Sequence, residues 1–185
     1  ARWQHPELGL VLPDSFLLYA EESEEIIKLD SFVTKQAMDQ VNEWREIYGQ
    51  DYFLSVNVSA RHFYQKGFTN FLKDACIEHD FPPEKLVLEL SEKTITESPN
   101  TAERLFLSLK QDGYKMALDD FGNGSSSLHA LAGFSLSYIK IDRRLVANVQ
   151  DSNRYQKFLN LMNHLSEDMN ASLVFEGVET KAEYE

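Results

Sequence analysis

Apolar residues along the chain follow two alternating patterns, one typical of amphipathic helices and one typical of short buried strands. Across residues 32–47 they recur every three or four positions, which predicts a helix that Asp30 or Ser31 caps and that Gly49 ends. Residues 52–58 are rich in aromatic and β-branched side chains, which predicts a strand. The same two patterns then repeat. They predict helices at residues 68–80, 101–111, 126–132 and 153–169, and strands at residues 85–90, 114–118, 138–141 and 172–175.

The two ends of the chain differ from this regular middle part. Residues 1–6 carry no start signal for a helix or a strand, as though a strand had been cut just upstream, whereas Pro13 and Asp14 are typical of a helix entry. The last residues, up to Glu185, fall inside a further predicted helix. We therefore expect a single domain over residues 1–185 that is incomplete at both ends.

Strands that alternate with helices predict an α/β fold with a parallel sheet, because parallel strands need a crossover connection. Residue counts alone leave a closed barrel and an open doubly wound sheet as alternatives. No predicted strand is followed by the Gly-x-Gly-x-x-Gly turn that is typical of a dinucleotide-binding sheet. Polar residues at the strand ends favour the other alternative, a TIM-type (β/α) barrel.

A polar residue stands at the carboxyl end of each of five predicted strands. In chain order these residues are Asn57, Glu89, the adjacent pair Asp119 and Asp120, Lys140, and Glu176. Each has an ordinary structural alternative, such as a turn cap for Asp120 or a surface ion pair for Lys140. Because all strands of a parallel barrel point the same way, agreement among five strand ends favours one common site.

Composition narrows the classes of function. The chain has 185 residues, 43% of them hydrophobic, which suits one globular domain, and its formal net charge of −12 repels long polyanions. It contains no basic stripe for a nucleic-acid polymer, no apolar run of membrane-spanning length and no signal peptide. The single cysteine, Cys76, lies at helical spacing among apolar residues, which predicts a buried thiol rather than a nucleophile. A small anionic ligand is compatible with this charge if cations offset the repulsion.

The residue types at the strand ends predict a divalent-cation site. An asparagine oxygen and several carboxylates are ligands that suit Mg²⁺ or Mn²⁺ better than zinc, and the histidines form no His-Glu-x-x-His pair. Adjacent Asp119 and Asp120 could hold two cations, which suits hydrolysis of a phosphodiester. Lys140 would position the attacking water or offset developing charge, and Glu176 would accept a proton. A glycosidase also uses two carboxylates at barrel strand ends, but it needs neither the lysine nor the cations.

Five short motifs together resemble the EAL domain family, whose members are bacterial phosphodiesterases that linearise cyclic di-GMP to pGpG with Mg²⁺ or Mn²⁺. The resemblance runs through the whole chain, and Arg2 to Pro6 resembles the segment that directly follows the family's Glu-Ala-Leu signature. The five motifs occur in family order at residues 57–60, 89–92, 119–122, 140–142 and 176–179.

The resemblance implies a role for each matching residue. Asn57, Glu89 and Asp119 are implied to bind a metal ion, and Asp120 is implied to serve a second one. Lys140 is implied to hold the water or a metal-bound oxygen, and Glu176 to act as the general base.

Three further residues take roles from the same resemblance. Glu92 resembles the glutamate that ties down the loop after Asp120. Arg2 resembles an arginine that contacts a substrate phosphate, and Glu179 a residue that supports substrate or metal.

The resemblance also sets expectations about the parent protein. The signature glutamate, a metal ligand in the family, would lie just before Ala1, and the family's final strand would lie beyond Glu185. We expect a homodimer in the cytoplasm, with fused sensory or GGDEF-type domains and possible membrane anchoring of the parent. The alternative function is a catalytically inactive cyclic di-GMP receptor that acts through a partner domain.

Overall fold

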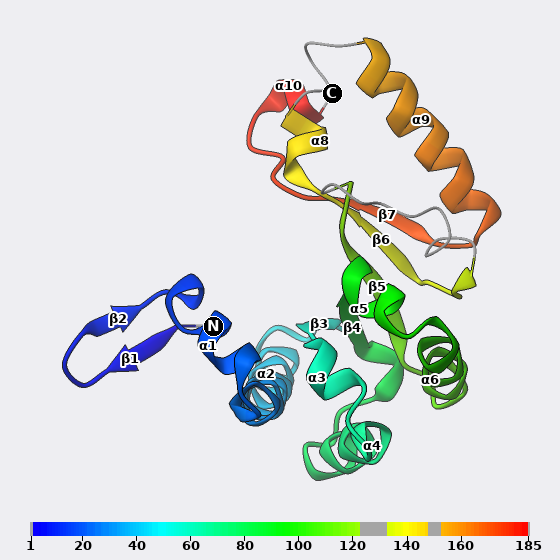
Figure 1. Cartoon of the computed structure of the whole chain (residues 1–185). Helices are drawn as coiled ribbons and strands as arrows, with labels where there is room; N and C mark the ends of the chain where they lie inside the picture. Colours follow the sequence, from blue (N-terminus) through cyan, green and yellow to red (C-terminus); the bar gives the residue numbers. More distant parts are fainter. Residues whose placement is uncertain (1, 123–132, 148–152, 185) are drawn as a thin grey trace. The chain divides into compact units, whose positions relative to one another are not determined.

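A computed structural model of the chain describes residues 2–122, 133–147 and 153–184 (Figure 1). It divides into two compact units, Ala1–Leu86 and Val87–Glu185. Whether the two units form the single expected domain stays a prediction. Among the described residues, no helix combines the length and apolar character needed to cross a membrane.

The first unit consists mainly of helices preceded by a hairpin. The antiparallel hairpin pairs β1 (Trp3–His5) with β2 (Gly9–Val11), a feature that the sequence pattern did not predict. The elements that follow are η1 (Pro13–Ser15), α1 (Leu17–Glu22), α2 (Glu25–Tyr48), β3 (Leu54–Asn57), α3 (Ala60–Phe63), α4 (Phe68–Glu78) and η2 (Pro83–Lys85). The buried side chains of α4 are Phe68, Leu72, Ala75 and Cys76, so the predicted burial of the thiol is confirmed.

Helix α2 begins earlier than predicted, so the expected cap at Asp30 or Ser31 is wrong. The helix starts at Glu25, and Ile26 in its first turn is only 3% exposed, so burial of an apolar side chain extends the helix toward the N-terminus. The Asp30 carboxylate instead accepts hydrogen bonds from Ser59, at 3.0 Å from the backbone N–H and 2.6 Å from the hydroxyl. The predicted end is confirmed, because Gly49 caps the helix with a φ of 61°.

Asp30 therefore ties α2 to the segment after β3, and its removal should destabilise the protein. For Asp30→Ala we expect the free energy of unfolding to fall by about 2 kcal/mol, because the Ser59 donors lose a charged acceptor in a part-buried place. Urea denaturation measures this change. Glu25→Ala, which removes an exposed carboxylate of the same helix, is the matched control and should leave stability unchanged within error. Equal stabilities for the two variants would contradict the prediction.

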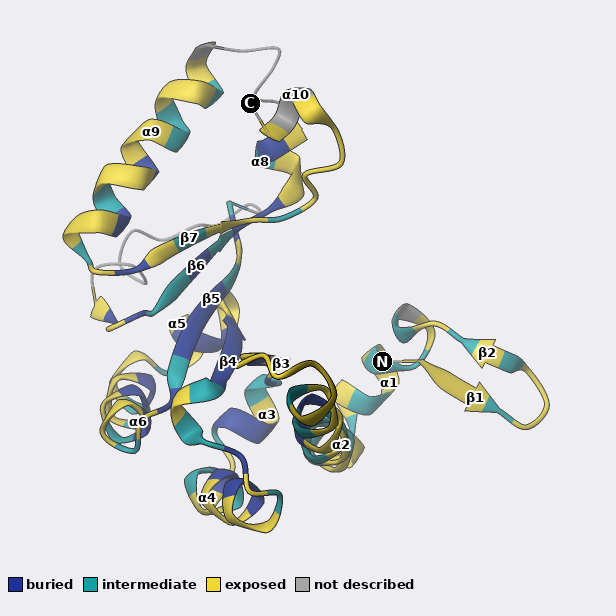
Figure 2. Cartoon of the chain, turned by 180° about the vertical axis from the view of Figure 1, so that it is seen from behind, coloured by how far each residue is buried: buried dark blue, intermediate teal, exposed yellow. Residues whose placement is uncertain are grey.

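The second unit carries a parallel sheet in which β4 (Leu86–Ser91), β5 (Lys115–Phe121), β6 (Tyr138–Ile141) and β7 (Ser172–Phe175) lie in chain order. The described residues of this unit form the helices α5 (Glu92–Glu97), α6 (Pro99–Gln111), α8 (Arg143–Ala147), α9 (Asn153–Asp168) and α10 (Lys181–Tyr184). The prediction of an α/β fold with parallel strands is confirmed. Figure 2 shows buried residues along β4 and β5, whereas β7 is mostly exposed.

The predicted strands in the second unit match the structure closely, but several short helices were missed. Helices α3, α5 and α8 have four to six residues, which is too few for an apolar repeat to be recognised. Strand β5 also continues through Asp119 and Asp120 to Phe121, whereas the pattern placed its end at Leu118. The predicted helix at residues 126–132 lies outside the described residues.

Candidate metal centre

Strand β5 contains an irregularity at its two acidic residues. Its register with β6 pairs Leu118 with Ile139 and then Phe121 with Ile141, so Asp119 and Asp120 together face the single residue Lys140. This two-to-one arrangement is a β-bulge. Asp120 has a φ of 53°, in the left-handed region that aspartate tolerates better than most residues. In a regular strand neighbouring side chains point to opposite faces, so the bulge explains how both carboxylates reach one site.

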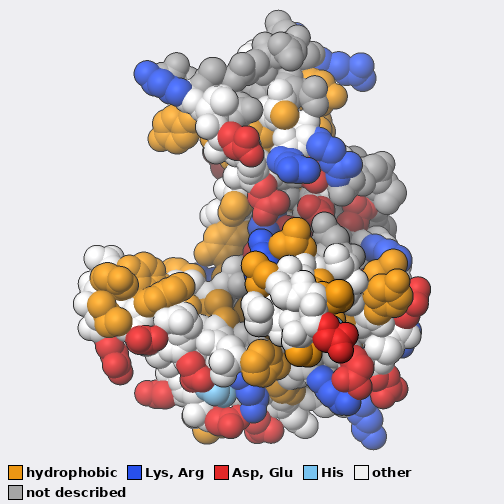
Figure 3. All heavy atoms as spheres, turned by 90° about the vertical axis from the view of Figure 1, so that its left-hand side faces the viewer, with side chains coloured by type: hydrophobic (Ala, Val, Ile, Leu, Met, Phe, Trp, Pro, Cys, Tyr) orange, Lys and Arg blue, Asp and Glu red, His pale blue; other side chains and the backbone are white. Residues whose placement is uncertain are grey.

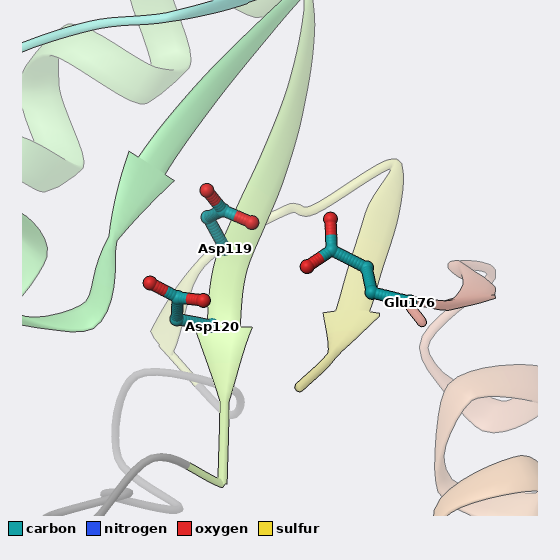
Figure 4. A group of neighbouring side chains, drawn as sticks. All are labelled: Asp119, Asp120 and Glu176. Atoms are coloured by element: carbon teal, nitrogen blue, oxygen red, sulfur yellow. The ribbon is translucent and has the colours of Figure 1, made fainter. Parts of the chain in front are cut away.

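Glu176 completes a cluster of three carboxylates with these two aspartates. One carboxylate oxygen from each of Asp119, Asp120 and Glu176 lies within 4.8 Å of the others (Figure 4). Glu176 directly follows β7, and its backbone N–H donates to the Ile141 carbonyl at 3.1 Å, which extends the β6–β7 ladder by one bond. The cluster therefore joins the ends of strands that are more than fifty residues apart along the chain.

Lys140 on β6 lies at the centre of the surrounding charges. Its Nζ lies 2.8 Å from Asp119 Oδ1, 2.7 Å from Glu176 Oε1 and 2.9 Å from Glu89 Oε2. Glu89 is a buried residue of β4. The four neighbouring strands of the second unit thus each contribute a charged residue, on the strand or directly after it.

The electrostatics of the group favour addition of a cation. Burial raises the pKa of the Asp120 carboxyl, and the charges of Asp119, Asp142 and Glu176 raise it further against the opposing effect of Lys140. Burial alone would lower the pKa of Lys140, but its interactions with Asp119, Glu176 and Glu89 outweigh burial and raise the pKa. Lys140 therefore stays protonated, and a single ammonium faces four carboxylates.

The residues present fit Mg²⁺ or Mn²⁺. The ligand atoms of the cluster are all carboxylate oxygens, which these hard cations prefer, and no described histidine or cysteine belongs to the cluster. Burial and then repulsion from Asp119, Asp142 and Glu176 raise the pKa of Asp120, and a bound cation would relieve the repulsion. Carboxylates held this close, with a protonated lysine beside them, could bind divalent cations and act on a phosphate ester.

The structure brings together five of the predicted site residues, namely Glu89, Asp119, Asp120, Lys140 and Glu176. Asn57 and Arg2 are exposed residues of the first unit, so their participation stays a prediction. Glu92 is the first residue of α5, and the loop that it was expected to hold lies outside the described residues. Glu179 is exposed beyond β7, and its role also stays a prediction.

Two glycines beside the carboxylates allow close contact with α8. A Cβ on Gly122 would lie 2.2 Å from Leu145 Cδ1, and one on Gly177 would lie 2.5 Å from Arg143 Cβ. Both glycines have positive φ values, 99° and 69°. Because they follow Asp120 and Glu176, short helix α8 supports both acidic strand ends, a role that the sequence reasoning missed.

The sequence reasoning included Asp142 in the motif at residues 140–142 but gave it no role; the residue is 6% exposed and its charge contributes to the raised pKa of Asp120. The available signal was its position two residues after Lys140, which places both residues on the same side of an extended segment.

A family model described as EAL domain matches residues 1–185. The chain is 31% identical over 184 residues to the bifunctional diguanylate cyclase/cyclic di-GMP phosphodiesterase MucR of Pseudomonas aeruginosa, covering 100% of this chain and 27% of that protein. It is 34% identical over 182 residues to the cyclic di-GMP phosphodiesterase PdeR of Escherichia coli, covering 98% of this chain and 27% of that protein. The chain thus spans about a quarter of the length of these relatives.

Solved structures agree with the sequence comparison. The MucR phosphodiesterase in complex with c-di-GMP superposes with a TM-score of 0.89 at 31% identity, covering 98% of this chain and 74% of that one. The FimX EAL domain of Xanthomonas citri, in complex with c-diGMP, has a TM-score of 0.87 at 20% identity, covering 99% and 72%, and shows the fold alone. The predicted α/β, TIM-like fold class is confirmed.

Proposed function

The chain belongs to the EAL domain family, and from that premise we propose that it hydrolyses cyclic di-GMP to linear pGpG with two Mg²⁺ or Mn²⁺ ions. The observation that carries the proposal is the cluster of Asp119, Asp120 and Glu176 oxygens within 4.8 Å, beside Lys140. The names of MucR and PdeR, both phosphodiesterases of this ligand, support the choice of substrate.

Each residue of the site would have its own role in this reaction. The cations, when bound, would polarise the phosphodiester and lower the pKa of the attacking water. Asp119 and Asp120 would hold them, together with Glu89 and Asn57 as the family resemblance implies. Glu176, whose side chain is 34% exposed, would accept the proton of the water. Lys140 would keep the carboxylates in place and offset negative charge on the phosphate.

The electrostatic setting also supports cations as partners of an anionic substrate. Four carboxylates against one ammonium leave a local excess of negative charge, which repels a phosphodiester unless cations are present. On the face that Figure 3 shows, basic and acidic side chains are interspersed, and its described side chains form no continuous basic stripe. A small ligand held through metal ions therefore suits this chain better than a nucleic-acid polymer.

A receptor without catalysis is the second candidate. The observation that favours it is the position of Lys140, whose ion pairs with Glu89, Asp119 and Glu176 partly neutralise the carboxylates without any cation. Such a receptor would bind cyclic di-GMP and signal through a partner domain. Homodimerisation, cytoplasmic location and fused sensory or GGDEF-type domains belong to the proposal for the parent protein under either candidate.

The decisive experiment uses the full-length protein that contains this chain. With cyclic di-GMP and Mg²⁺ or Mn²⁺ we expect pGpG as the product, measured by chromatography, and no product after chelation with EDTA. Asp119→Asn and Asp120→Asn should each lower turnover by roughly a hundredfold or more, because each removes a charged cation ligand. Binding of cyclic di-GMP without pGpG formation would reject the enzyme and support the receptor.

A further inference from the structure

Lys140 lies among the carboxylates that a divalent cation would bind. Strand β6 runs between β5 and β7, and its register places Lys140 opposite Asp119 and Asp120 on one side and opposite Val174 on the other. Glu176 comes two residues after Val174, so in extended backbone the two side chains lie on the same side. The pairing of the three strands therefore brings one lysine between the acidic residues of both neighbouring strands.

The ammonium of Lys140 forms ion pairs with the same residues that the cations would need. Its Nζ lies 2.8 Å from Asp119 Oδ1 and 2.7 Å from Glu176 Oε1, and both residues belong to the three-carboxylate cluster. A third contact, 2.9 Å to Glu89 Oε2, comes from β4. Because the Lys140 side chain is only 14% exposed, solvent screens these ion pairs weakly.

The ammonium is nevertheless an incomplete substitute for a metal ion. Asp119 Oδ1 is buried and accepts a hydrogen bond from none of the described residues, although Lys140 Nζ lies 2.8 Å away. The contact is therefore an attraction between charges rather than a directed hydrogen bond. A divalent cation brings twice the charge and coordinates carboxylate oxygens directly, so it could take over this place.

A purely stabilising ion pair is the simpler explanation for Lys140, but the number of its partners goes beyond that role. Three carboxylates from three strands surround one ammonium, and two of them are ligands of the proposed cations. The ammonium therefore neutralises part of the charge that attracts a cation. It also repels a cation only a few ångströms away, where the interaction between charges is strong. The lysine that stabilises the cation-free site thus opposes cation binding.

We propose that Lys140 competes with the divalent cations for Asp119 and Glu176, and that this competition sets the cation concentration at which the site fills. The proposal rests on the proposed function, whose regulation it describes. Without cations, the ion pairs of Lys140 keep the carboxylates together. A cation has to replace these ion pairs before it is held, so occupancy of the site follows the supply of Mg²⁺ or Mn²⁺.

The test is a calorimetric titration of the metal-free, full-length protein with Mn²⁺, in which the signal of the cluster is the one that Asp119→Asn removes. For Lys140→Met we expect a Kd for Mn²⁺ roughly tenfold lower than that of the wild type, because the carboxylates lose their competitor. Lys140→Arg keeps the charge and should bind Mn²⁺ no more tightly than the wild type. If Lys140→Met does not fold, Lys140→Gln removes the charge but keeps a polar group. Lys110→Met, which removes an exposed lysine, is the matched control and should leave Kd unchanged.

An equal or higher Kd in the uncharged Lys140 variant would overturn the proposal, because Lys140 would then arrange the carboxylates for the cation instead of competing with it. If the wild type binds Mn²⁺ but forms no pGpG, the proposed enzyme fails, and the ratio of the Kd values still decides the competition. If the wild type binds no Mn²⁺, binding by Lys140→Met would support the competition, and its absence would overturn it.

Discussion

Replacement of Glu176 by glutamine is expected to lower kcat for cyclic di-GMP by roughly a hundredfold to ten-thousandfold, while KM stays close to the wild-type value. Glutamine has nearly the same shape, and its oxygen can still accept from Lys140, which lies 2.7 Å from Glu176 Oε1. It cannot take a proton from water. The loss therefore falls on the chemical step rather than on substrate binding, and steady-state kinetics of pGpG formation measure both constants.

A second glutamate provides the control for this substitution. Glu167 is an exposed residue of α9 whose carboxylate accepts from Asn163 in the same helix. Glu167→Gln makes the same chemical change outside the cluster and should leave kcat and KM unchanged. If Glu176→Gln retained full turnover, Glu176 would have no role as the base. A rise in KM at constant kcat would assign it to ligand binding instead.

Replacement of Lys140 by methionine is expected to have the largest effect on stability. It removes the ammonium that contacts Glu89, Asp119 and Glu176, whose side chains are 10%, 16% and 34% exposed. Loss of one partner of a buried ion pair costs about 3–5 kcal/mol, because the remaining charges stay buried without compensation. In EDTA we therefore expect a free energy of unfolding lower by about this amount, measured by urea denaturation.

Divalent cations should restore part of the free energy of unfolding that Lys140→Met loses, if the carboxylates form a cation site. Mg²⁺ or Mn²⁺ would replace the missing positive charge, and binding to the folded state alone adds about 2.7 kcal/mol at a hundred times Kd. Lys110→Met, which removes an exposed lysine, should match the wild type with and without the cations. Equal stability of Lys140→Met and wild type in EDTA would show that the carboxylates do not depend on Lys140. If Mg²⁺ or Mn²⁺ left the free energy of unfolding of Lys140→Met at its value in EDTA, the result would argue against a cation site.

The strand ends and the charged residues beside them could be predicted from the sequence. The predicted strand at residues 172–175 coincides with β7, and the strand at residues 138–141 coincides with β6. Glu89, Asp119, Asp120, Lys140 and Glu176 were selected because they stood at or beside such ends, and the structure brings them together. This part was predictable because strand apolarity is local, and because a parallel sheet places all carboxyl ends at one edge.

The chain's own pattern determined the order of strands and helices, and with it the set of charged residues that meet at one edge of the second unit. Only the tertiary structure decided how they meet. The bulge that turns Asp119 and Asp120 to the same site depends on the register between β5 and β6, and the hydrogen bonds of Asp30 depend on Ser59. The central position of Lys140 likewise arises from contacts between residues of different strands. Apolar periodicity carries no information about register, because it reports which face of an element is buried and not which residue lies opposite.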